Sequence, residues 1–203
     1  MPANVVEVAR VMIDHGIDKA DLDYALELTL TSSVAREQGH QLPLVRALIA
    51  AGSTSHAKAV VVAAGHAELD ILRALVEDGY PMSAPLAAAL SSNETLQKLL
   101  ATSDAHEIQT AFGLAVINRN LEGARGALDA GADVNAFLPV HAHSTALHQA
   151  AVNDDAALVE LLLARGAQIN VPDKLWEATA LDWAVHERKP AAQAPLERAL
   201  RQP

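Results

Sequence analysis

The sequence predicts an all-α fold made of repeated helix–turn–helix pairs. Three observations lead to this prediction: a helix-ending pattern recurs along the chain, two segments of the C-terminal half align with each other, and the apolar residues are small. Of the 203 residues, 51% are hydrophobic but only 3% are aromatic. Alanine, valine, leucine and isoleucine therefore supply the apolar content, and such side chains suit close packing between short helices.

The recurring pattern is apolar-x-x-apolar-apolar-x-x-Gly. Its endings are Gly16, Gly52, Gly79, Ser103 (serine for glycine), Gly131 and Gly166, spaced by 36, 27, 24, 28 and 35 residues. Because glycine accepts the left-handed backbone that terminates many helices, each ending predicts the end of one helix pair. We therefore expect about six repeats and about thirteen helices, and the long first interval predicts one extended helix over residues 21–37.

Two segments of the C-terminal half align directly. They begin at Thr110 and Thr145, and a third start follows at Thr179, at spacings of 35 and 34 residues. Residues 145–150 read Thr-Ala-Leu-His-Gln-Ala, and residues 162–170 read Leu-Leu-Ala-Arg-Gly-Ala-Gln-Ile-Asn. Threonine at such a start can cap the first helix through its hydroxyl group.

In these residues the chain resembles the ankyrin repeat family, whose units of about 33 residues begin with Thr-Pro-Leu-His-x-Ala. Residues 145–150 differ from that motif only in having alanine for proline. The resemblance covers residues 105–190 and implies an ankyrin-type solenoid with hairpin fingers mainly in the C-terminal half. We expect one ankyrin repeat domain over residues 1–203, with degenerate short-loop repeats in 1–104 and regular repeats and a C-terminal cap in 105–203.

Charge and composition exclude several kinds of partner. The formal net charge is −10 at pH 7, which disfavours nucleic acids and anionic membranes, because surfaces that bind phosphate concentrate lysine and arginine. Cysteine is absent, so disulfides and thiolate metal sites are excluded. Residues 1–13 do not read as a signal peptide, and no stretch is apolar enough to span a bilayer. We expect a cytoplasmic protein, a monomer rather than an oligomer, and the alanine-rich composition suggests a bacterial source.

The resemblance implies recognition rather than catalysis, since ankyrin repeats are generally binding modules. The sequence has no cysteine nucleophile, no Gly-x-Ser-x-Gly and no glycine-rich phosphate loop, so we expect no enzyme and no cofactor. The expected function is that of an adaptor or scaffold that binds a protein on its concave groove and fingers. Two alternatives stay open: capture of a small molecule or nucleotide in the concave pocket, and, less favoured, a metal site at His141 and His143.

The binding residues are expected on two fingers, residues 131–144 (the first finger) and 166–178 (the second finger), and on the inner helices beside them. Aromatic side chains are enriched at interface hot spots, and both tryptophans of the chain lie in or beside the second finger. The candidate groove residues are Leu114, Ile117, Asn118, Phe137, His141, His143, Gln149, Val152, Asn153, Trp176, Trp183 and His186.

Each group of candidates also has a structural explanation. Phe137 and Val140 belong to an apolar run that marks an interaction site if it faces water, but they can instead fold back on the neighbouring finger. Trp176 can plug the join between the last two repeats, with Trp183 packed against it. The asparagines among the candidates can serve as helix-end caps.

Overall fold

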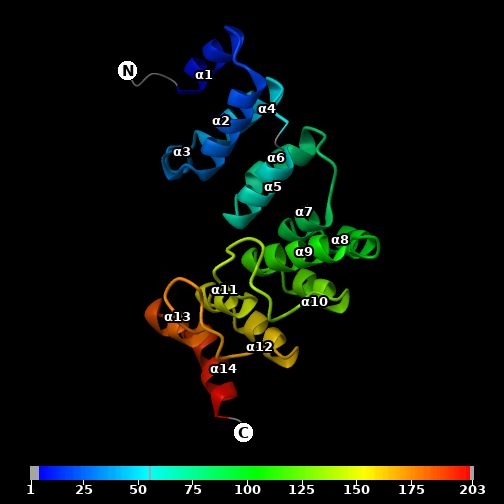
Figure 1. Cartoon of the computed structure of the whole chain (residues 1–203), viewed down its shortest axis with the longest axis vertical. Helices are drawn as coiled ribbons and strands as arrows, with labels where there is room; N and C mark the ends of the chain where they lie inside the picture. Colours follow the sequence, from blue (N-terminus) through cyan, green and yellow to red (C-terminus); the bar gives the residue numbers. More distant parts are fainter. Residues whose placement is uncertain (1–4, 55, 202–203) are drawn as a thin grey trace. The chain divides into compact units, whose positions relative to one another are not determined.

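A computed structural model describes residues 5–54 and 56–201, which form fourteen helices and no strand (Figure 1). The chain divides into two compact units, Met1–Pro81 and Met82–Pro203. Each unit consists of paired helices, so the predicted all-α fold of helix–turn–helix repeats is confirmed. The single-domain organisation stays a prediction, and the two units are described separately below.

The N-terminal unit contains two helix pairs and two additional helices, α1 and the short α3. Its helices are α1 (Val5–Asp14), α2 (Lys19–Thr31), α3 (Ser33–Glu37), α4 (Gln41–Ala50), α5 (His56–Gly65) and α6 (Leu69–Glu77). Helix α2 packs on α4, α5 packs on α6, and α1 contacts α4. Leu26, Leu30, Val45 and Leu72 are buried between these helices, so branched aliphatic side chains form the core of this unit.

The single helix predicted over residues 21–37 is wrong, because the chain breaks at Ser32 into α2 and α3. Ser32 has an extended backbone (φ −76°, ψ 111°), and its Oγ accepts a hydrogen bond from the backbone N–H of Ala35 at 3.1 Å. A serine that caps the following helix competes with continuation of the preceding one. The described residues therefore form fourteen helices instead of about thirteen.

The C-terminal unit is a stack of four helix pairs. Its helices are α7 (Ala84–Ala89), α8 (Asn93–Leu100), α9 (Ala105–Ile117), α10 (Leu121–Asp129), α11 (Ala146–Val152), α12 (Ala156–Ala164), α13 (Ala180–His186) and α14 (Pro190–Leu200). The first helix of each pair contacts the first helix of the next pair, and the second helices do the same. One continuous apolar cluster runs from Ala84 to Leu196. Each pair thus buries its apolar face on its neighbour, which no pair could do alone.

The turn inside a helix pair has the same backbone geometry in five repeats. One non-glycine residue is left-handed (φ between 54° and 59°), and the following N–H donates a hydrogen bond of 2.8 to 3.1 Å to an alanine carbonyl five residues earlier. The left-handed residues are Ala67, Ser91, Arg119, Asp154 and Arg188, and the acceptors belong to Ala63, Ala87, Ala115, Ala150 and Ala184. All five acceptor alanines are fully buried. The turn therefore recurs with the repeat: its acceptor is always alanine, whereas the left-handed position varies in residue type.

The second helices of the pairs end as the glycine pattern predicts. Gly131 and Gly166 are left-handed, with φ of 105° and 85°. The N–H groups of the next residues, Ala132 and Ala167, each donate 3.0 Å hydrogen bonds back into the preceding helix. A Cβ at either glycine would meet nothing within 4 Å, so the backbone conformation, and not lack of space, requires glycine here.

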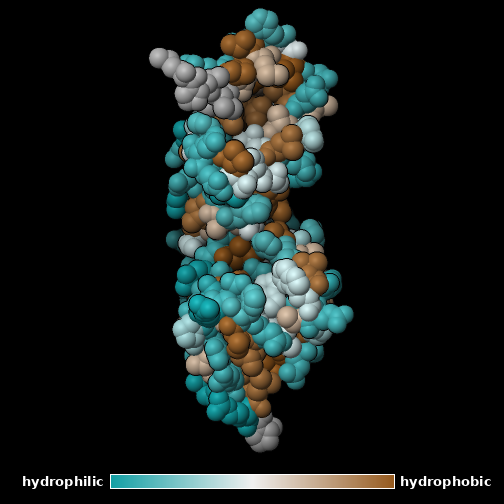
Figure 2. Space-filling view, turned by 90° about the vertical axis from the view of Figure 1, so that its left-hand side faces the viewer, coloured by the Kyte–Doolittle hydropathy of each residue, from teal (hydrophilic) through white to brown (hydrophobic). Residues whose placement is uncertain are grey.

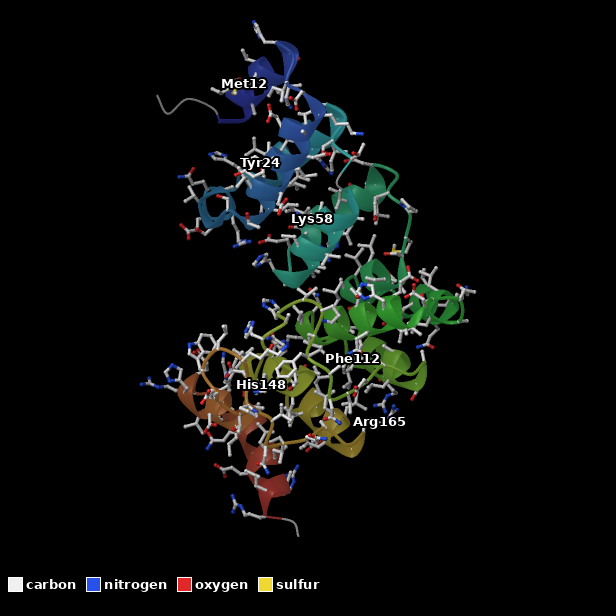
Figure 3. The ribbon with its side chains drawn as sticks, in the orientation of Figure 1. Met12, Tyr24, Lys58, Phe112, His148 and Arg165 are labelled. Carbon is white, nitrogen blue, oxygen red and sulfur yellow. The ribbon has the colours of Figure 1, made fainter. Side chains whose placement is uncertain are left out.

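Both units keep some large apolar side chains at the surface. Met12 and Tyr24 in the N-terminal unit are labelled in Figure 3, and Leu175 and Trp176 are exposed in the C-terminal unit. Figure 2 shows hydrophobic residues among hydrophilic ones over the visible face of each unit. No helix in the described part of the chain is long and apolar enough to cross a membrane.

Truncating the repeat leucines tests the register of the stack. Leu147 and Leu162 are buried, with at most 2% of their surface exposed, so we expect Leu147→Ala and Leu162→Ala each to lower the free energy of unfolding by about 2–5 kcal/mol. Urea denaturation followed by circular dichroism measures the change. Leu200→Ala, at an exposed position of α14, is the control and should have little effect. Two neutral variants at Leu147 and Leu162 would contradict the register.

Candidate binding site

The first finger folds back on its own unit through Leu138. Phe137 forms an antiparallel bridge with Thr145, and the N–H of Leu138 donates a 3.0 Å hydrogen bond to the carbonyl of Ser144. Leu138 is buried, and its Cδ2 lies 3.5 Å from the position that a Cβ on Gly113 would occupy. The apolar run of residues 137–140 is therefore not an exposed patch as a whole: Phe137 and the residue at 140 are half-buried, and Leu138 is core.

The second finger is organised around the carboxylate of Asp173. Oδ1 accepts hydrogen bonds from the backbone N–H groups of Leu175 at 2.7 Å and Trp176 at 2.8 Å. Oδ2 accepts from the N–H of Ala178 at 3.1 Å and from the indole N–H of Trp183 at 3.0 Å. Asp173 is itself buried, with 2% of its surface exposed. One side chain thus holds both the loop and the tryptophan of the following helix.

These hydrogen bonds determine the charge of Asp173. Burial alone would raise the pKa of its carboxyl, but the donors on Trp176, Leu175, Trp183 and Ala178 outweigh burial and lower the pKa from 3.8 to about 2. Hydrogen bonds to the ionised form of a carboxylate favour that form. Asp173 is therefore a carboxylate anion at every pH above about 4.

His148 connects the start of α11 to the second finger. Its Nδ1 accepts a hydrogen bond from the backbone N–H of Thr145 at 3.3 Å and lies 2.8 Å from the hydroxyl of the same threonine. Its Nε2 lies 3.0 Å from the carbonyl oxygen of Ala178 and donates to it. Burial lowers the pKa of His148, against the opposing effect of the Ala178 carbonyl. This neutral, buried ring (labelled in Figure 3) joins the start of α11 to the second finger.

Four aromatic rings meet where the two fingers approach α13. The ring centroids of Trp176 and Trp183 are 5.7 Å apart with an interplanar angle of 63°. The His143 ring lies 6.1 Å from Trp176 and 5.9 Å from Trp183, and His148 lies 5.1 Å from Trp183. Trp183 is half-buried in this cluster, whereas Trp176 remains 68% exposed. Trp176 therefore does not plug the join between the last two repeats.

The two indoles border a pocket of about 610 Å³ on this side of α13. Its lining residues are Val152, Trp176, Ala178, Asp182, Trp183, His186 and Glu187. Two carboxylates belong to this set, and lysine and arginine do not. The pocket therefore combines aromatic faces with negative charge.

The structure brings some of the candidate groove residues together and separates others. Val152, Trp176, Trp183 and His186 line one pocket, and His143 contacts both tryptophans. The ammonium group of Lys174 lies 3.9 Å from the centroid of the Phe137 ring.

Two candidates are corrected, because they lie inside the repeat stack. Leu114 is fully buried in α9 and cannot contact a partner. Gln149 is also buried, and its Nε2 donates a 2.9 Å hydrogen bond to the Oγ of Ser144 at the base of the first finger. The repeat motif places both in the position of Trp183, but that position is buried in the two earlier repeats.

The candidate asparagines make helix-end contacts. The Nδ2 of Asn118 donates to the carbonyl of Leu114 at 2.8 Å. The Nδ2 of Asn153 donates to the carbonyls of Val116 at 3.3 Å and Ile117 at 3.2 Å, which joins two repeats. Both side chains and Ile117 are half-buried, and none of the three lines the pocket.

The histidines of the first finger form a ring pair. His141 and His143 have centroids 5.9 Å apart in an edge-to-face arrangement. Burial, followed by the nearby His141, lowers the pKa of His143, and Asp173 opposes this effect. Within residues 5–54 and 56–201, no three His, Cys, Asp or Glu side chains are grouped so that they could hold a metal ion.

Sequence reasoning missed Asp173, Asp182 and Glu187. A signal for Asp173 was present, because Pro-Asp is a turn dipeptide and aspartate accepts hydrogen bonds from the backbone just after it. A signal for Asp182 was also present, because an aspartate near a helix start can accept backbone hydrogen bonds; it forms a capping box with Thr179. Nothing in the sequence marks Glu187 as a pocket residue.

A stack of helix pairs with two long fingers defines a helical repeat protein. Residues 85–173 match the family model described as ankyrin repeats (3 copies), which covers the chain from α7 through the second finger as far as Asp173. Residues 85–173 of the chain are thus ankyrin repeats, as the motif at residues 145–150 predicts. A search of curated proteins finds no match to the chain. Ankyrin repeats generally mediate protein–protein interaction, and proteins built from them are typically not enzymes.

Replacing Asp173 tests its role as the centre of the second finger. Asp173→Asn presents an N–H₂ group or a single oxygen to four N–H donors, so we expect a loss of about 1–3 kcal/mol in unfolding free energy at pH 7. Because the folded pKa of about 2 lies below the ordinary 3.8, the stabilisation is present above pH 4 and is lost as the pH falls towards 2.

Thermal denaturation of wild type and variant between pH 7 and pH 2 measures this effect. The difference in Tm should shrink as the pH falls from 4 to 2. Asp133→Asn is the matched control, since Asp133 is an exposed first-finger aspartate that accepts one N–H, from Asn135 at 2.8 Å. A Tm difference that does not change with pH over this range would contradict the assignment.

Proposed function

We propose that the chain is a non-catalytic protein-binding module, an adaptor or scaffold, that contacts its partner through the fingers and α13 of the C-terminal unit. The observation that carries this proposal is Trp176, whose indole is 68% exposed beside a pocket of about 610 Å³. A large aromatic side chain held at the surface is costly in water and is typical of interface hot spots.

The rigidity of the fingers supports the same function. Asn135 of the first finger accepts a 2.8 Å hydrogen bond from the N–H of Gln168 and donates a 3.1 Å bond to the carbonyl of Gly166. Lys174 N–H donates to the carbonyl of His143 at 2.9 Å, so the fingers are joined at two places. A surface ordered before binding loses less conformational entropy when the partner arrives.

The contact surface that we propose is centred on Trp176, Trp183 and His186, with Val152 and His143 beside them. Phe137, His141, Ile117, Asn118 and Asn153 border it. The net charge of −10 favours a protein partner over nucleic acid or an anionic membrane. We also propose that the protein is cytoplasmic and monomeric.

Affinity capture from native cell lysate tests the function with Trp176→Ala. The exposed indole makes its main ring contacts at one edge of the cluster, so we expect the variant to keep the wild-type Tm within about 2 °C and to lose most of the partner retained by wild type. Tyr24→Ala is the matched control, because Tyr24 is an aromatic residue of similar exposure, 61%, in the other unit.

A partner retained equally by wild type and Trp176→Ala would place binding elsewhere on the chain. Trp183→Ala is a poorer probe, since Trp183 donates to Asp173 and packs on His148. Its loss would change both binding and stability.

Small-molecule capture is the second candidate, and the volume of the pocket favours it. About 610 Å³ lies within the 300–1,000 Å³ typical of ligand sites. A thermal-shift screen of metabolites separates the two candidates: a compound that raises the Tm of wild type but not that of Trp176→Ala supports capture. Partner retention that depends on Trp176, with no such compound, supports the adaptor.

A further inference from the structure

The pocket beside Trp176 and Trp183 has a defined charge. Asp182 and Glu187 are its two carboxylates. Asp182 Oδ2 accepts hydrogen bonds from the hydroxyl of Thr179 at 2.7 Å and from its backbone N–H at 2.8 Å, and these bonds lower the pKa of Asp182. The carboxylate of Glu187 lies 3.9 Å from the Nε2 of His186 and is half exposed. Negative charge therefore lies at the rim of an aromatic pocket.

We propose that this pocket receives an arginine side chain of the protein partner. The guanidinium stacks on an indole face of Trp176 or Trp183, and its N–H groups donate to the carboxylates of Asp182 and Glu187. This inference rests on the proposed function, because it names the chemical group by which the partner is recognised. It also makes Asp182 and Glu187 specificity-determining residues.

The chemistry of the pocket selects a planar cation over other groups. A guanidinium is flat, always charged and weakly hydrated, so it stacks on aromatic rings while its edge donates to carboxylates. An aliphatic side chain would gain nothing from the two carboxylates, and an acidic side chain would be repelled by them. A lysine ammonium carries the charge but has no planar face for the indole.

The same unit already contains a contact of this kind. The ammonium of Lys174 lies 3.9 Å from the centroid of the Phe137 ring, so cations and aromatic rings pair at the neighbouring surface. The net charge of −10 adds a long-range attraction for basic segments, which raises the rate of encounter at low salt.

Tryptophan fluorescence, excited selectively over tyrosine, reports on this pocket alone, because the two tryptophans of the chain both line it. The probes are peptides of the form acetyl-Gly-Gly-X-Gly-Gly-amide, with X as arginine, citrulline or glutamate, titrated to millimolar concentrations. Citrulline matches arginine in shape but carries no charge. We expect saturable quenching by the arginine peptide, about tenfold weaker binding of the citrulline peptide, and no binding of the glutamate peptide.

Glu187→Gln is the variant that tests the carboxylate. Glu187 is exposed at the C-terminal end of α13, so the variant should retain the Tm of wild type and bind the arginine peptide severalfold more weakly. Glu160→Gln, on an exposed face of α12 outside the pocket, is the control and should bind as wild type does. The two indole N–H resonances of a ¹⁵N-labelled sample provide a second readout.

Equal binding of the arginine and citrulline peptides, or no change in fluorescence and in the indole resonances, would overturn the inference. That failure is distinct from failure of the proposed function. If partner retention depends on Trp176 but the arginine peptide does not bind, the proposed adaptor function stands and the arginine proposal fails. Selective binding of the arginine peptide supports the inference even if the lysate yields no partner.

Discussion

The structure depends on one turn, in which the N–H after a left-handed residue donates to the carbonyl of a buried alanine five residues earlier. This hydrogen bond reverses the chain between the helices of a pair at Ala63, Ala87, Ala115, Ala150 and Ala184. All five alanines are fully buried, and a larger side chain at such a packed position would overpack the turn and force the neighbouring helices apart. Small side chains let the short helices of each unit pack closely, which accords with a chain rich in alanine and poor in aromatics.

The binding surface follows from how the fingers are attached to that stack. The first finger inserts Leu138 over Gly113 and covers the repeat beneath it. The second finger is held by Asp173 and by the carbonyl of Ala178, which His148 contacts. Because these polar contacts satisfy the loop internally, its apolar residues Leu175 and Trp176 are not needed in the core and stay exposed. A stable scaffold thus presents an aromatic side chain to solvent.

The sequence predicts the features that recur in every repeat well, and it predicts the features that occur only once poorly. Periodic signals report on structure that recurs, so they can be recognised from the sequence alone. Examples are the glycine endings at Gly131 and Gly166 and the motif at residues 145–150. The break at Ser32 was missed because a serine mid-pattern is compatible with either a helix interior or a cap. Leu114 shares its motif position with the half-buried Trp183, but its burial is a property of the packed stack that the motif position alone does not show.

The role of Asp173, which organises the candidate site, could not be predicted from periodic sequence patterns. Its donors lie two, three, five and ten residues further along the chain, a spacing that belongs to no helix or strand. An ionised carboxylate has two oxygens, accepts about four hydrogen bonds and donates none, which matches four N–H groups. Asparagine offers one such oxygen, and glutamate adds a methylene that would displace the loop from α13. The surface that displays Trp176 and Trp183 is therefore coupled to a single charge, and the same ionised state that stabilises the fold orders the surface proposed for binding.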